Sequence, residues 1–171
     1  YYKYKTIIFG IEPDQYKNLR PFKDRIKNRI VNSGALGNPS LKSRTFNKFM
    51  NPKRTGWDFY KLRTKCNKLP YVTHTRKIAQ EYNNYSYIQL LSEFQTSIAA
   101  TTHYPTIKYL ESTAAGCLTF MEITNHNNGK YLGFKDRKTS IFINEKNYSE
   151  RFEEYLNSIN DPKWEEIANN G

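Results

Sequence analysis

Cysteine is scarce in this sequence, and long apolar runs are lacking. Cys66 and Cys117 are the only cysteines among 171 residues, so we expect neither a disulfide framework nor a cysteine-based metal site. We therefore expect a reducing compartment and assign the chain to the cytoplasm. No stretch approaches the ~18 consecutive apolar residues of a membrane-spanning helix, and no signal peptide opens the chain. Because the first residue is Tyr1 and not methionine, we expect a piece of a longer protein.

Acidic residues are also few relative to basic ones. The chain has 27 Lys and Arg against 16 Asp and Glu, a formal net charge of +11. Such a charge suggests an anionic partner, which is a nucleoside diphosphate, an anionic membrane face or nucleic acid. The 14 tyrosines offer stacking platforms for nucleic acid, but the cations are spread over the chain and no recognised nucleic-acid motif is present. We therefore favour nucleic acid least.

Short apolar runs alternate with helical patterns along the chain. We expect strands at residues 6–10, 29–32, 69–73, 96–100, 117–121 and 140–144. We expect helices at residues 40–50, 57–66, 76–82, 85–94 and 106–116, and two more after Asn147 and Asp161. This order predicts an α/β fold with a doubly wound, Rossmann-like parallel sheet. Residues 1–27 should form a linker with a first strand and a basic, solvated segment, and residues 28–171 a single domain.

Two of the expected helices carry detailed predictions. In the helix at residues 40–50, Leu41, Phe46 and Phe49 should face the core. In the helix after Asn147, the Asn147 side chain should cap the first turn. None of the expected helices is basic and apolar enough to predict membrane binding by itself.

The most informative stretch is residues 103–118 (HYPTIKYLESTAAGCL), which lies between two apolar runs. Its apolar residues recur at helical spacing, with Thr106 as the expected N-cap and Gly116 as the residue that ends the helix. Lys108 and Glu111 are three residues apart, so they share a face. The helix N-terminus favours an anion, so the stretch suits a phosphate with one cation and one carboxylate beside it.

This stretch resembles the donor-binding motif of retaining glycosyltransferases with the GT-B fold, the glycosyl transferases group 1 family. In that family, two glutamates separated by seven residues precede small residues, a glycine and an apolar strand. Glu111 matches the second glutamate, which the resemblance assigns to the ribose hydroxyls of a nucleotide sugar. His103 stands where the first glutamate is usual, so the catalytic candidate at this position is a hydrogen-bond donor or weak base instead of a carboxylate.

The resemblance implies the C-terminal, donor-binding half of a GT-B enzyme. Such an enzyme transfers a sugar from a nucleoside-diphosphate sugar, with retention, to a glycan or lipid-linked acceptor. The acceptor would bind an N-terminal domain that this sequence lacks. No metal or other cofactor is expected, because cations and backbone amides neutralise the leaving diphosphate. Tyr104, Thr106 and Lys108 would contribute to this clamp, and a basic surface would meet anionic lipid at the inner membrane face.

A glycine-containing loop at residues 33–39 (SGALGNP) follows the second expected strand. A strand, such a loop and a helix can together cradle a phosphate, but the same pattern also fits a tight turn. On the first reading, Gly34 and Gly37 face the diphosphate, and Lys42 or Arg44 supplies a cation. On the second reading, the two cations lie on the surface.

Several alternatives stay open. His74 ends an expected strand, where it is a candidate for the nucleobase or ribose pocket or else a structural histidine. A flavodoxin-like or receiver-like regulatory domain has the same layered topology, but residues 29–37 lack the acidic residues of a receiver. A non-catalytic remnant that only binds a nucleotide sugar would also explain His103.

Overall fold

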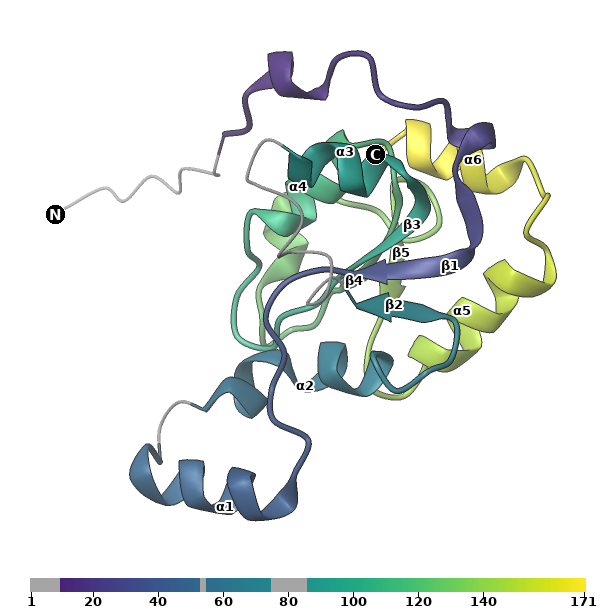
Figure 1. The fold of residues 1–171 in the computed structure, drawn as a ribbon. Helices are drawn as coiled ribbons and strands as arrows, with labels where there is room; N and C mark the ends of the chain where they lie inside the picture. The colour runs from purple at the N-terminus through teal and green to yellow at the C-terminus, as the bar shows by residue number, and fades with distance from the viewer. Residues whose placement is uncertain (1–9, 53–54, 75–85) are drawn as a thin grey trace, which may run out of the picture.

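The structure is a computed structural model that describes residues 10–52, 55–74 and 86–171 (Figure 1). Its centre is a five-stranded parallel sheet with the strand order β2-β1-β3-β4-β5. The strands are β1 (Ile26–Asn32), β2 (Val72–His74), β3 (Phe94–Ala99), β4 (Leu118–Glu122) and β5 (Ile141–Ile143). The expected doubly wound, Rossmann-like α/β fold is confirmed.

Six α-helices and three short 3₁₀ helices are described around this sheet. The α-helices are α1 (Leu41–Met50), α2 (Gly56–Cys66), α3 (Ser86–Ser92), α4 (Lys108–Ala114), α5 (Tyr148–Asn157) and α6 (Lys163–Asn169). The 3₁₀ helices are η1 (Pro13–Tyr16), η2 (Phe22–Asp24) and η3 (Gly129–Leu132). None of the described helices is long and apolar enough to cross a membrane.

The two faces of the sheet are covered by different helices. Successive strand residues point to opposite faces, so Ile30 and Val31 enter separate clusters, as do Phe120 and Met121. On one face, α2, α5 and α6 supply the partners, with Trp164 as the largest fully buried side chain. On the other face, α3 and α4 close the core. Strands β3 and β4 are buried along their whole length because both faces of the sheet are covered there.

The strand order places a topological switch point beside β1. After β1, the chain first forms β2 on one side of β1 and then crosses to form β3 on the opposite side of β1. In sheets of this type, ligands bind at the carboxyl ends of the strands, where the two crossovers part. The loops after β1 and β3 are therefore the first place to look for a site.

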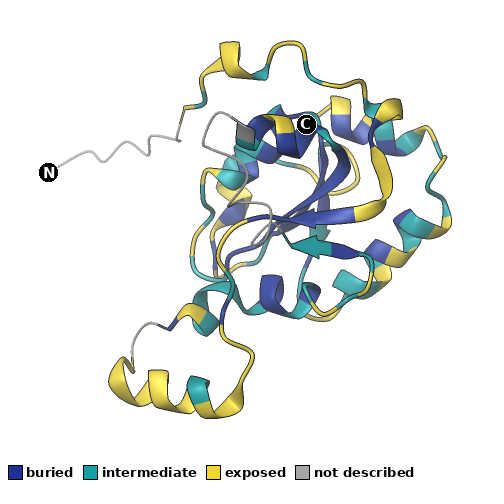
Figure 2. Ribbon diagram, viewed as in Figure 1, coloured by how far each residue is buried: buried dark blue, intermediate teal, exposed yellow. Residues whose placement is uncertain are grey.

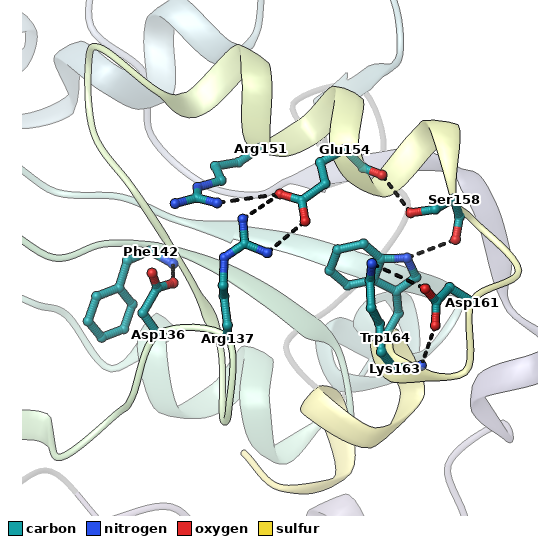
Figure 3. Close-up of polar contacts among 9 residues, drawn as sticks. All are labelled: Asp136, Arg137, Phe142, Arg151, Glu154, Ser158, Asp161, Lys163 and Trp164. Atoms are coloured by element: carbon teal, nitrogen blue, oxygen red, sulfur yellow. Dashed lines mark hydrogen bonds and ion pairs between the residues drawn. The ribbon is translucent and has the colours of Figure 1, made fainter.

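The carboxyl-terminal part of the chain is tied together by a polar network (Figure 3). Arg137 binds Glu154 of α5 through two N–H groups, at 2.6 and 2.7 Å. The indole of Trp164 donates to the Ser158 carbonyl at 2.9 Å, and the Ser158 hydroxyl donates to the Glu154 carbonyl at 2.7 Å. These bonds fix α6 relative to α5 and so hold Trp164 in the core.

Several sequence expectations need correction. The helix expected at residues 85–94 ends at Ser92, and Phe94 already belongs to β3. Asn147 precedes α5, but its side chain accepts from the Asn144 amide and does not cap the helix. The strand expected at residues 6–10 and the helix expected at 76–82 lie wholly or almost wholly outside the described residues.

The basic segment before residue 28 is not wholly solvated. Arg25 is buried, and its guanidinium donates to the carbonyls of Arg20 and Ala115, both at 2.8 Å. Phe22 packs against the main core cluster, and β1 begins at Ile26, before the expected start of the domain. The sequence predicts a solvated segment here because five cations with few apolar neighbours are typical of a surface, and it does not show the contact of Arg25 with the Ala115 carbonyl.

The prediction that Leu41, Phe46 and Phe49 face the core is wrong. They are 73%, 64% and 83% exposed, and α1 lies away from the sheet (Figures 1 and 2). Periodicity identifies a helix and its apolar face, but it does not show what that face contacts.

Candidate functional site

Gly34 lies at the centre of a cluster that follows the carboxyl end of β1. Its φ of 98° is in the left-handed region, which glycine adopts most easily. A Cβ added at this position would lie 2.9 Å from Lys108 Cε and 3.3 Å from Arg63 Nη1. The Nε2 of His74 donates to the Gly34 carbonyl at 3.0 Å. Only glycine therefore allows these side chains to approach the loop so closely.

Lys108 and Arg63 bring two positive charges to this loop from opposite faces of the sheet. The Nζ of Lys108 donates to the Tyr87 hydroxyl at 2.8 Å, and that hydroxyl lies 2.8 Å from the Ser33 hydroxyl. Arg63 is only 2% exposed, and its Nη1 donates to the Ala35 carbonyl at 3.1 Å. The Nε and Nη2 of Arg63 have no hydrogen-bond partner among the described residues. The cluster thus retains unused donors.

Burial destabilises the charged forms of Lys108 and Arg63. It lowers the pKa of Lys108 to about 8, an effect that Arg63 strengthens and Glu111 opposes. Burial also lowers the pKa of Arg63. An anion placed between the two cations would favour their charged forms and remove part of this cost. The cluster therefore has the electrostatics of an anion site.

Glu111 lies one turn after Lys108 on α4, as the sequence predicts. Burial raises the pKa of Tyr16, and the charge of Glu111 adds to this effect; the same charge partly opposes the lowering of the Lys108 pKa. Lys108 and Glu111 therefore offer a cation and a hydrogen-bond acceptor at one edge of the sheet.

Thr106 does not cap α4 as expected. The helix begins at Lys108 after Ile107, and the buried Thr106 hydroxyl has no hydrogen-bond partner in the described part of the chain. The Thr106 carbonyl accepts from the Tyr109 amide instead.

A second cluster surrounds His103. Its Nδ1 is 3.0 Å from Nε2 of His126, so one of the two rings donates to the other. The His103 ring also packs edge-on against Phe59, with ring centroids 4.8 Å apart, and Tyr104 packs against the same ring. The structure therefore places His103 and Tyr104 with His126, and not in the Lys108 cluster.

A cavity of about 710 Å³ opens beside His126, at the carboxyl ends of β4 and β5. Its wall includes Glu122, which is 5% exposed and whose Oε2 has no partner among the described residues. Burial raises the pKa of Glu122 to about 7, and Glu145 adds to this effect. The carboxylate and the neighbouring Thr124, Asn125 and Asn144 form a polar lining suited to hydroxyl groups.

The remaining predicted residues lie elsewhere. Gly37 is buried against α2, where a Cβ would be 2.6 Å from Trp57 Cα, and its amide donates to the Thr64 hydroxyl. Lys42 is exposed on α1, and the Arg44 guanidinium stacks 3.7 Å from the centroid of the Trp57 ring. The structure thus brings together Gly34, His74 and Lys108 but not Gly37, Lys42 or Arg44.

Arg63 and Glu122 are site residues that sequence reasoning missed. Arg63 lies in the helix expected at residues 57–66, between Lys61 and Lys65, and the sequence pattern alone assigns it no role in a site. The available signal was its spacing of four residues from Phe59 and three from Cys66, which places a cation on the inward face. Glu122 ends an apolar strand, and a carboxylate at that position predicts a cleft residue.

No group of three or more potential metal ligands occurs among the residues described. Models of known protein families do not match the sequence, and comparison with curated proteins finds no significant similarity.

Proposed function

We propose that this chain is the nucleotide-sugar donor-binding half of a retaining GT-B glycosyltransferase. The observation that carries the proposal is the convergence of Lys108 and Arg63 on Gly34, at the switch point of the sheet. Nucleotides bind doubly wound sheets at this point, and two cations beside a glycine fit a diphosphate.

The diphosphate would lie beside the Gly34 loop, next to the Lys108 and Arg63 side chains that pack against this glycine. Lys108 would exchange the Tyr87 hydroxyl for a phosphate oxygen, and Arg63 would use the two donors that have no partner in the described part of the chain. Both cations would then stabilise the charge that grows on the diphosphate as it leaves the sugar. No metal is required for that task.

Glu111 would accept hydrogen bonds from the ribose, since it lies one helical turn beyond Lys108. His74 would border the nucleobase or ribose, and His103 would lie toward the transferred sugar. The glycan or lipid-linked acceptor would bind an N-terminal domain, which would complete the cleft. We assign no protein nucleophile.

A chain that binds the donor without catalysis is the second candidate. It is favoured by His103, whose ring is held by His126 and Phe59 and carries no carboxylate. Both candidates share the nucleotide site, so binding is tested first.

The test is calorimetry of the chain against UDP, GDP, ADP, CMP and their sugars, with and without magnesium. We expect one nucleoside diphosphate to bind without metal. Arg63→Met should abolish this binding without loss of stability, because the buried Arg63 cation has two N–H groups with no partner among the residues that the structure describes, and such a cation is costly to fold. The matched control is Arg25→Met, which removes two backbone hydrogen bonds and should lower stability while nucleotide binding persists.

A second pair of variants tests the ribose assignment. Glu111→Ala should weaken nucleotide binding at least tenfold, whereas Glu166→Ala, at an exposed position of α6, should leave it unchanged. Equal effects of the two substitutions would contradict the role of Glu111. Salt-sensitive binding of single-stranded oligonucleotides, without nucleotide binding, would overturn the whole proposal.

A further inference from the structure

Helix α1 presents its apolar side to solvent. Leu41, Phe46, Phe49 and Met50 are all at least 64% exposed, and together they cover one side of the helix. Figure 1 shows α1 as a projection from the body of the domain, and Figure 2 shows that most of it is exposed. Two phenylalanines on one exposed helix are a costly arrangement unless something covers them.

The side of α1 that faces the domain is polar. The Arg44 guanidinium stacks on the Trp57 ring of α2, and Lys48 pairs with Asp58 at 3.1 Å. A helix that completes a core packs in the opposite sense, with its apolar side inward. The attachment of α1 through its cations therefore fixes the outward direction of the apolar side.

The charge around α1 identifies the partner. Helix α1 itself contains three cations, Lys42, Arg44 and Lys48, and no Asp or Glu. At 100° per residue, Lys42 projects among the exposed apolar side chains, between Phe49 and Phe46. An apolar helix face with cations attaches to a membrane surface when the lipids are anionic, since both contributions are needed for stable binding.

We propose that α1 docks this domain on an anionic membrane surface, a role independent of the proposed nucleotide site. The apolar side chains enter the boundary between headgroups and acyl chains, and Lys42 meets the lipid phosphates. A second copy of this chain is a poorer partner, because it brings the same positive charge to the contact.

The experiment is co-sedimentation of the whole chain with phosphatidylcholine vesicles, with and without phosphatidylserine. We expect binding only when phosphatidylserine is present. The double variant Phe46→Ser/Phe49→Ser should reduce this binding at least tenfold. The control is Tyr131→Ser, because Tyr131 is also an exposed aromatic residue, at 69%, but lies on η3.

Insertion is checked separately by fluorescence. In Phe49→Trp, the emission should shift to shorter wavelength when the anionic vesicles are added, and in Tyr131→Trp the added indole should show no such shift. Unchanged vesicle binding by the double variant would overturn the proposal. So would a wild-type dimer that fails to bind vesicles and becomes monomeric in the double variant, since a second copy would then cover α1.

Discussion

Glu122 combines burial with an open cavity, and this affects stability as well as binding. Its carboxylate has a pKa raised to about 7, because burial penalises the charged form. The unfolded chain ionises at the ordinary value of 4.5. Below pH 4.5 the group is neutral in both states and has no electrostatic cost. Between pH 4.5 and 7 the unfolded state loses its proton first, so the folded state loses relative stability until the cost levels off above pH 7.

Glu122→Gln should therefore stabilise the protein in a pH-dependent way. The gain should grow between pH 4.5 and 7 and reach about 3 kcal/mol at pH 8, since each pKa unit corresponds to about 1.4 kcal/mol. Urea unfolding at pH 4.5 and pH 8 measures the difference. Glu150→Gln, at an exposed position of α5, should show no such change. A gain that is equal at both pH values would contradict the assignment of the titration to Glu122.

At the scale of single elements, the carboxyl end of α4 packs closely against the Arg25 side chain. Gly116 has a φ of 70°, its amide donates to the Thr113 carbonyl, and the Cys117 amide donates to the Ser112 carbonyl. This pattern is a Schellman motif, and it confirms Gly116 as the residue that ends the helix. The Arg25 guanidinium fills the space beside Gly116 and binds the Ala115 carbonyl.

Gly116→Ala should destabilise the protein more than Gly133→Ala. Both glycines have positive φ, so both substitutions cost about 1 kcal/mol of backbone strain. A Cβ at Gly133 meets nothing within 4 Å, whereas one at Gly116 lies 3.0 Å from Arg25 Nη2. Displacement of Arg25 should add about 1–2 kcal/mol through the weakened charged hydrogen bond. Thermal unfolding of the two variants measures the difference, and equal losses would show that Arg25 adjusts freely.

Among the single elements, those that depend on a local sequence pattern could be predicted. Alternating strands and helices, the end of α4 at Gly116 and the loop at Gly34 were predictable, because each depends on a local pattern. The contacts of α1 were not, because they depend on Trp57 and Asp58 of another helix. The burial of Arg63 was also hard to predict, since Lys61 and Lys65 lie two residues away on either side and are typical of a surface helix. Non-local contacts therefore decide which residues form the site.

At the scale of the whole molecule, positive charge is in excess. Most of the described ion pairs are substantially exposed, so they contribute little, and the net charge of +11 should cause self-repulsion. We therefore expect the midpoint of thermal unfolding to rise with sodium chloride.

Sulfate at the same ionic strength should raise the midpoint further, because the proposed anion site between Lys108 and Arg63 would bind it. The extra rise should disappear in Arg63→Met but persist in Arg25→Met. A midpoint that falls with salt would show that the ion pairs outweigh the repulsion. An extra rise that persists in Arg63→Met would locate sulfate elsewhere.

The position of β1 in the sheet also has a consequence for synthesis. This strand lies between β2 and β3, yet roughly sixty residues separate its end from the start of β3. At about 5–20 residues per second, the ribosome needs several seconds to supply that partner. During this interval β1 lacks its β3 partner, so Ile30, Val31 and the phenylalanines of α1 stay exposed in the nascent chain. A growing chain of this protein is therefore a natural client for chaperones that bind apolar segments at the ribosome.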